Sequence, residues 1–149
     1  MTTKWDYRFL RLAEEIAIWS KDPSTKVGAV IVRPDNTIAS TGYNGFPMNM
    51  ADKPEYLDNR DEKYSRVVHG EMNAILFARE SVNGYTLYTV PFMPCDRCFV
   101  HVAQAGIVRV VFPKCPEDKL VRWKDAFDKV RRYAEEVGIE LTEVEEKHG

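Results

Sequence analysis

The sequence predicts a three-layer α/β/α domain around a five-stranded mixed β-sheet. Three observations lead to this fold class: an amphipathic stripe near the N-terminus, two β-rich segments joined by a tight turn, and a later succession of strand, helix and strand. A chain of 149 residues is long enough to bury a core without disulfides, so we expect residues 1–149 to form a single domain.

The N-terminal half is expected to form a helix and a β-hairpin. Apolar residues recur at three- and four-residue intervals from Trp5 to Trp19, which is the spacing of one helix face. Val27–Val32 and Thr37–Tyr43 are rich in strand formers, and the RPDN sequence between them favours a turn. From Asn44 to about Arg66, turn residues and many charges predict a long functional loop or a lid.

The C-terminal half alternates predicted helices with predicted strands. The expected helices are Glu71–Arg79, Cys95–Gln104 and Glu117–Val137. The expected strands are Tyr85–Val90, Ile107–Phe112 and, at an edge of the sheet, Ile139–Val144. Gly106 and Gly138 follow two of these helices, where glycine commonly ends a helix. The short links between strand, helix and strand predict parallel pairing through a right-handed crossover.

Composition narrows the class of protein. Hydrophobic residues make up 44% of the chain and charged residues 30%, with a net charge of -2, as in ordinary globular proteins. The longest apolar run, VGAVIV, is too short to span a membrane, and charges interrupt the N-terminal residues where a signal peptide would be apolar. We therefore expect a cytoplasmic protein without a membrane partner. Basic residues alternate with acidic ones, which favours a small-molecule substrate over nucleic acid.

Two cysteines and one histidine predict a metal site. Cys95 and Cys98 lie three apart at the start of a predicted helix, and His69 of HGEMNA lies at the start of the preceding one. One nitrogen and two sulfur ligands are typical of a zinc site whose fourth position is open to water. Residues three apart on a helix lie about 60° apart around its axis, so both cysteines can face one ion. The positive end of each helix dipole favours the thiolate form.

Glu71 is the expected proton carrier at this metal site. It follows His69 by two residues, an offset that directs its carboxylate toward the open position of the metal. A carboxylate placed there can accept a proton from the activated water and deliver it later. The pattern H-x-E followed by P-C-x-x-C is typical of zinc-dependent nucleobase deaminases.

Longer segments extend this pattern into a family resemblance. SKDPSTKVGAVIV, GYNGFP, KYSRVVHGEMNAI and PFMPCDRCFVHVAQAGI occur in the order and spacing seen in the deoxycytidylate (dCMP) deaminase family, and they cover roughly residues 20–112. The chain resembles this family, which implies a cytidine-deaminase-like fold and a zinc-dependent hydrolysis of dCMP to dUMP and ammonia. The interval of about 25 residues between GYNG and His69 resembles the dCMP branch rather than the tRNA-adenosine or free-cytidine enzymes.

The resemblance also implies roles for individual residues. It implies that Zn²⁺ is bound by His69, Cys95 and Cys98, and that Glu71 shuttles protons. For the substrate, it implies that Asn44 bonds the sugar and base region, that the backbone N–H near Gly70 meets the pyrimidine carbonyl, and that Lys26 contacts the phosphate. It further implies a homo-oligomer, with a hexamer among the expected assemblies. FPMNMADKP replaces the Gly-Cys-Ser-Asp type run of members regulated by dCTP and dTTP.

Several alternatives stay open from the residues alone. In the alternative enzyme hypotheses, the chain deaminates another substrate: dCTP, a 5-modified dCMP, cytidine or an RNA adenosine. In a non-enzymatic hypothesis, Cys115 supplies a fourth ligand, and the chain is a binding module with a structural zinc. A redox-active Cys-x-x-Cys pair is the third alternative for Cys95 and Cys98.

Overall fold

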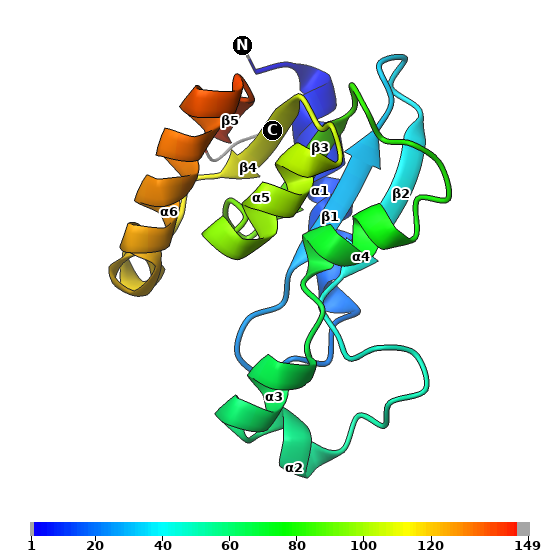
Figure 1. Ribbon diagram of the computed structural model, residues 1–149, viewed down its shortest axis with the longest axis vertical. Coiled ribbons are helices and arrows are strands. Elements are labelled where there is room, and N and C mark those ends of the chain that lie inside the picture. Colours follow the sequence, from blue (N-terminus) through cyan, green and yellow to red (C-terminus); the bar gives the residue numbers. More distant parts are fainter. Residues whose placement is uncertain (1, 146–149) are drawn as a thin grey trace.

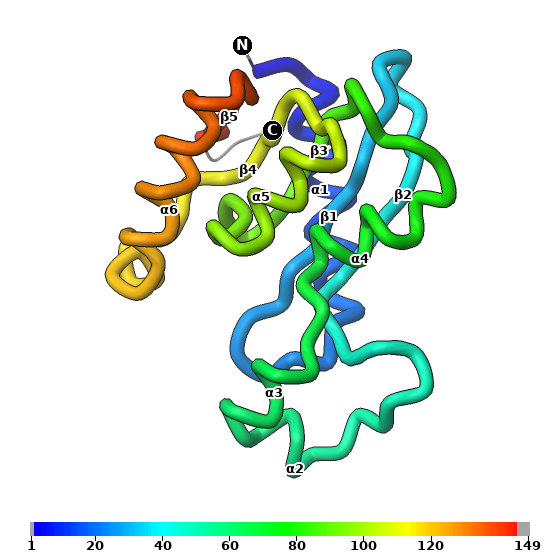
Figure 2. Tube along the Cα trace, viewed as in Figure 1, coloured from blue at the N-terminus to red at the C-terminus, as the bar shows by residue number. Residues whose placement is uncertain are grey.

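The computed structural model describes residues 2–145 and confirms the predicted fold class. Its helices are α1 Lys4–Ile18, α2 Pro54–Leu57, α3 Arg60–Arg66, α4 Gly70–Leu76, α5 Asp96–Gln104 and α6 Glu117–Val137. Its strands are β1 Gly28–Val32, β2 Ile38–Tyr43, β3 Thr86–Val90, β4 Arg109–Pro113 and β5 Glu140–Val144. Figure 1 shows these elements, and Figure 2 follows the chain between them.

The five strands form one mixed sheet in the order β2-β1-β3-β4-β5. β1 pairs antiparallel with β2 and with β3, which confirms the predicted hairpin. β3 pairs parallel with β4, and α5 forms the crossover between them. β5 pairs parallel with β4 at the edge of the sheet, where the sequence predicts it. The central position of β3 therefore joins an antiparallel half of the sheet to a parallel half.

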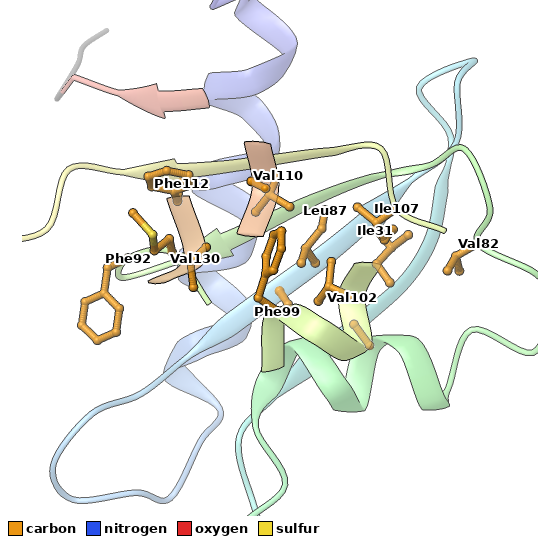
Figure 3. Close-up of a cluster of buried hydrophobic side chains, with 14 of the residues drawn as sticks. Ile31, Val82, Leu87, Phe92, Phe99, Val102, Ile107, Val110, Phe112 and Val130 are labelled. Atoms are coloured by element: carbon orange, nitrogen blue, oxygen red, sulfur yellow. The ribbon is translucent and has the colours of Figure 1, made fainter. Parts of the chain in front are cut away.

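Helices cover both faces of this sheet, and each face has its own apolar core. Val30 and Val32 of β1 pack on the side of α1, whereas Ala29 and Ile31 pack on the side of α4, α5 and α6. This alternation is the two-residue period of a strand that is buried on both faces. Figure 3 shows the second of these cores, in which side chains of α5 and α6 meet those of β3 and β4.

Glycines let two helices approach the sheet closely. A Cβ atom on Gly28 would lie 2.0 Å from the carbonyl oxygen of Ala13 in α1. A Cβ atom on Gly42 would lie 2.4 Å from the backbone nitrogen of Ala74 in α4. Because both obstacles are backbone atoms, a side chain at either position would push a helix away from its strand. The position of α4, which carries Glu71, therefore depends on Gly42.

Two predictions about local structure are corrected. Residues 44–66 are not a continuous loop, because α2 begins with Pro54 at its first turn and α3 is capped by the Asn59 side chain, which accepts the N–H of Glu62 at 3.1 Å. The predicted helix Glu71–Arg79 ends earlier, at Leu76, and Arg79 has a φ of 60°. In the described part of the chain, no helix is long and apolar enough to cross a membrane.

Candidate active site

The predicted metal ligands meet where two helices begin at one end of the sheet. The pairing of Gly28 with both Tyr43 and Val90 places the start of β1 beside the ends of β2 and β3. At this end His69 is the N-cap residue of α4, and Cys95 is the N-cap residue of α5. The carboxyl end of a strand that leads into a helix is a common position for binding sites in α/β proteins.

The structure brings His69, Cys95 and Cys98 together. Their ligand atoms all lie within 4.8 Å of one another. The Nδ1 atom of His69 is 2.9 Å from the Sγ of Cys98 and 3.8 Å from the Sγ of Cys95. The imidazole therefore presents Nδ1, rather than Nε2, to the two sulfur atoms.

Charge within the cluster favours a bound cation. The hydrogen bond from Cys98, together with those from His69, lowers the pKa of the Cys95 thiol to about 4, although burial opposes the shift. The pKa of Cys98 is raised, by its hydrogen bond to Cys95 and by burial. The hydrogen bond to Cys95 also raises the pKa of His69. The Cys95 thiolate thus accepts hydrogen bonds from Cys98 and His69. A metal ion that binds here takes the place of the protons in these hydrogen bonds.

The donor set fits zinc. Two sulfur atoms and one imidazole nitrogen match the ligands of zinc sites that keep a fourth position open. Cys95 and His69 also line a cavity that contains Glu71, so the cluster faces a space where substrate and water can enter. Among the described residues, the cluster has no fourth cysteine or histidine. These observations distinguish it from a closed structural site.

Glu71 is a buried carboxyl group in the first turn of α4, with 4% of its surface exposed. The Oγ1 of Thr89 donates to its Oε2 at 3.4 Å, a long hydrogen bond. Burial raises the pKa of Glu71, and this effect exceeds the opposing effects of backbone N–H donation and of His69. A carboxyl group with a raised pKa can both accept and release protons near neutral pH.

Asn44 connects several segments at the wall of the same cavity. Its Oδ1 accepts the backbone N–H of Val27 at 2.8 Å, and its Nδ2 donates to the carbonyl of Thr25 at 2.9 Å. Its neighbour Gly45 forms an isolated bridge with Val68, directly before His69. The side chain is only 5% exposed. Asn44 therefore fixes the loop that precedes β1 against the start of α4.

Gly70 is buried in the first turn of α4, beside the loop that Asn44 fixes. A Cβ atom here would lie 2.9 Å from the Cγ1 of Val27 and 3.2 Å from its carbonyl oxygen. The absence of a side chain thus allows the start of α4 to pack directly against the residue that precedes β1. The predicted role of its backbone N–H toward a pyrimidine carbonyl stays a prediction.

Lys26 and Cys115 lie away from the cluster. The ammonium group of Lys26 donates to the carbonyl of Ser20, and its side chain lines a different cavity, between α1 and the ends of β3 and β4. The thiol of Cys115 donates to the carbonyl of Pro116 at 3.4 Å and lies outside the cavity that contains Glu71. This placement gives no support to Lys26 as a phosphate contact or to Cys115 as a fourth ligand.

Among the residues of the cavity wall that were not predicted from the sequence, four belong to helices. Lys63 and Tyr64 come from α3, and Arg122 and Trp123 come from the first turns of α6. Lys63 and Tyr64 lie within the motif KYSRVVHGEMNAI, but nothing in their spacing indicates a cavity wall. Arg122 and Trp123 lie on a charged helix whose pattern indicates only a solvent-facing surface.

Comparisons with known proteins agree with this geometry. The model of the cytidine and deoxycytidylate deaminase zinc-binding region matches residues 3–114. A protein described as an uncharacterized deaminase in the luxG 3' region of Aliivibrio fischeri is 40% identical over 142 residues, which cover 95% of each chain.

Two animal relatives match over shorter stretches. A probable deoxycytidylate deaminase of Caenorhabditis elegans is 43% identical over 109 residues, which cover 70% of this chain and 55% of the relative. The deoxycytidylate deaminase of Homo sapiens is 38% identical over 115 residues, which cover 73% of this chain and 64% of the relative. The chain thus matches between about half and two thirds of the length of these two proteins.

A solved structure shares the fold. The dCMP deaminase of cyanophage S-TIM5 in complex with dCMP and dUMP superposes with a TM-score of 0.75. The match covers 97% of this chain and 99% of the phage chain at 24% sequence identity. The similarity extends over the sheet and the helices on both of its faces, so it supports the three-layer architecture.

Proposed function

Because the chain belongs to the family of cytidine and deoxycytidylate deaminases that share a zinc-binding region, we propose that it hydrolyses dCMP to dUMP and ammonia. The human relative is named a deoxycytidylate deaminase and the nematode relative a probable one, and the phage protein of the same fold was solved with dCMP and dUMP. The observation that carries the proposal is the buried Glu71 in one cavity with His69 and Cys95.

We assign the metal to His69, Cys95 and Cys98, whose donor atoms converge at the starts of α4 and α5. A zinc ion held there supplies Lewis-acid activation of a water molecule. The protein contributes two anionic sulfur ligands, an imidazole orientated through Nδ1, and an opening toward the cavity.

Glu71 carries the protons of the reaction. Hydrolytic deamination adds the oxygen of water to C4 of the pyrimidine ring and breaks the C4–N bond to the amino group. The Glu71 carboxylate accepts one proton from the attacking water and delivers it to N3 of the ring. It then accepts the remaining proton of the added water from the oxygen on C4 and transfers it to the departing amino group, which leaves as ammonia. The raised pKa of Glu71 suits this exchange, because the carboxyl group must be charged and neutral in turn.

Asn44 lines the cavity, and Gly70 lies between two of its lining residues, His69 and Glu71. We propose that the sugar lies along the segment that Asn44 fixes, and that the backbone at Gly70 faces the pyrimidine carbonyl. The Asn44 amide already bonds Val27 and Thr25, so its role includes shaping this wall. Lys26 as a phosphate contact stays a prediction from the sequence.

A substrate panel tests the proposal. Purified protein loaded with zinc is incubated with dCMP, dCTP, 5-methyl-dCMP, cytidine and an RNA adenosine hairpin, and ammonia release is measured for each. We expect dCMP to give the highest kcat/KM. A higher value for another member of the panel would retain the deaminase chemistry and replace dCMP as the substrate.

The non-enzymatic alternative is tested by the third cysteine. A structural site closed by Cys115 would lose zinc in Cys115→Ser, whereas the proposed site retains it. The thiol of Cys115 bonds its own neighbour Pro116, which favours the open site.

We also propose a homo-oligomer. Leu76 of α4 and Val100 of α5 are 60% and 48% exposed, and such apolar side chains are suited to an interface between copies. Light scattering that gives a monomer mass at micromolar concentration would contradict an oligomer; a mass of six chains would identify a hexamer.

A single domain over residues 1–149 and a cytoplasmic location stay predictions from the sequence.

A further inference from the structure

The cavity that contains Glu71 opens between α3 and α6. Tyr64 of α3 and Arg122 of α6 line this opening, and both are exposed, in contrast to Glu71. The Arg122 guanidinium donates to the Tyr64 hydroxyl. Its Cζ lies 5.9 Å from the Tyr64 ring centroid and 5.0 Å from that of Trp123. We call Lys63, Tyr64, Arg122 and Trp123 the mouth of the cavity.

The two cations of the mouth differ in their partners. The ammonium group of Lys63 lies 3.1 Å from the Asp22 carboxylate and 3.3 Å from the Ser24 hydroxyl. The side chains of Lys63 and Asp22 are only 9% and 11% exposed, so they form a largely buried ion pair whose charges cancel. For Arg122, in contrast, no carboxylate lies within salt-bridge distance among residues 2–145. Its charge is therefore available to a ligand.

A phosphate group fits this mouth. The guanidinium group offers a planar fork of N–H donors that can hold two oxygen atoms of one phosphate. The hydroxyl-bearing residues Ser24 and Thr25 line the same cavity, and the Ser24 hydroxyl contacts Lys63 of the mouth at 3.3 Å. When a pyrimidine ring reaches Glu71 at the buried end, the 5′ side of its sugar points away from the reacting C4 atom and toward the exposed end.

We propose that Arg122 recognises the 5′-phosphate of the substrate and thereby selects a nucleotide over a nucleoside, with Tyr64 as the residue that positions it. The assignment rests on the proposed function, because it takes the pyrimidine end of the cavity as given. The cavity measures about 90 Å³, below the range of about 300–1,000 Å³ that is typical of ligand pockets. The contact between Arg122 and Tyr64 holds the guanidinium at the mouth of this cavity.

Steady-state kinetics of Arg122→Ala on two substrates test this assignment. With dCMP, kcat/KM falls about 10- to 100-fold, mainly through KM, since a charge-assisted hydrogen bond pair is lost. With deoxycytidine, which has no phosphate, kcat/KM changes by less than about threefold. Arg122→Lys recovers part of the loss, because it restores the charge but not the fork. Tyr64→Phe gives a smaller increase of KM, again confined to dCMP.

The matched control is Lys124→Ala. This variant removes a cation from the same helix, but Lys124 pairs with Asp128 at 2.8 Å and does not line the cavity. Its kinetics with dCMP should equal those of the wild type. A binding measurement avoids turnover altogether: calorimetry should show that Arg122→Ala weakens dUMP binding about 10- to 100-fold and deoxyuridine binding much less.

The outcomes separate this assignment from the proposed function. Equal losses on dCMP and deoxycytidine, or unchanged kinetics in Arg122→Ala, would overturn the role of Arg122 while dCMP deamination by the wild type stands. A selective loss for dCMP in Lys26→Ala, but not in Arg122→Ala, would also overturn it and assign the phosphate to Lys26. A wild type that does not favour dCMP over deoxycytidine would instead contradict the proposed nucleotide substrate.

Discussion

Two buried carboxyl groups lie on opposite faces of the sheet and differ in their hydrogen-bond partners and in the direction of their pKa shifts. Asp6 of α1 is 1% exposed and Glu71 of α4 is 4% exposed. Burial raises the pKa of each, but for Asp6 the hydrogen bonds from Arg109, Tyr88 and Thr3 outweigh burial, and the net shift is downward. For Glu71 burial outweighs its few partners, and the net shift is upward.

The contacts explain this difference. Arg109 donates to both oxygen atoms of Asp6, at 3.0 and 2.9 Å, and the Tyr88 hydroxyl donates at 2.6 Å. The one side-chain donor to Glu71 among the described residues is Thr89, at 3.4 Å. Tyr88 and Thr89 are adjacent on β3 and point to opposite faces. A single strand thus provides a strong partner to one carboxylate and a weak partner to the other. We infer that Asp6 has a structural role and that the Glu71 carboxyl group is available for chemistry.

The largest effect is expected for Glu71→Gln. The amide has the shape of the carboxyl group but cannot carry protons, so turnover of dCMP should fall about 100- to 10,000-fold. Zinc content and the free energy of unfolding should stay near those of the wild type. The measurement combines elemental analysis, denaturant unfolding and ammonia release. Retained turnover would remove Glu71 from the role of proton carrier.

Asp6→Asn should have the opposite profile. It removes the buried carboxylate partner of the partly buried Arg109 guanidinium, which keeps its contact with the exposed Glu140 at 3.1 Å, so the free energy of unfolding should fall by about 3 kcal/mol. Turnover per folded, zinc-loaded molecule should change little, since Asp6 lies on the far face of the sheet from the zinc ligands. Urea unfolding and kinetics at a temperature well below the transition would measure both. A loss of turnover without a loss of stability would break the comparison.

The lowered pKa of Asp6 also predicts a pH dependence. Because the folded-state pKa lies below the unfolded value of about 3.9, Asp6 stabilises the fold above that value, and this contribution is lost as the pH falls through the folded-state pKa. The difference in unfolding free energy between wild type and Asp6→Asn should therefore be largest above about pH 4 and shrink below it. Urea unfolding at a series of pH values measures it. A difference that grows on acidification would contradict the assignment.

The smallest effects are expected for the two neighbours on β3. Tyr88→Phe removes a short hydrogen bond to a charged group and should cost about 1.5 kcal/mol of unfolding free energy without a change in turnover. Thr89→Val removes a long hydrogen bond to Glu71 and should lower kcat about tenfold or less, with little change in stability. Both variants should be measured in parallel, for stability and for turnover. The comparison of Asp6 with Glu71 predicts that Tyr88→Phe changes mainly stability and that Thr89→Val changes mainly turnover.

The sequence predicted those features that depend on local patterns. The start and end of α6 follow from its periodicity and from Gly138, whose φ of 80° allows the helix to end there. The motifs around His69 and Cys95 likewise indicate which side chains the structure brings together. The helices α2 and α3 were missed because their start signals, Pro54 and Asn59, also occur in turns.

Contacts between distant residues could not be predicted in this way. Asp6 and Arg109 are 103 positions apart, and Tyr64 and Arg122 are 58 apart, so no local spacing relates either pair. Both pairs depend on how the helices pack on the sheet. Neighbours along the chain can also separate in space: Val27 lines the cavity that contains Glu71, whereas the side chain of Lys26 lines another cavity.

Zinc removal tests the central claim most directly. The wild-type protein is stripped of metal with a chelator, dCMP turnover is measured, and zinc is then added back in steps. If His69, Cys95 and Cys98 hold a catalytic zinc, turnover should vanish in the stripped protein and return linearly, with saturation near one zinc per chain. Turnover that persists without zinc, or that stays absent when about one zinc per chain is bound, would contradict a zinc-dependent dCMP deaminase.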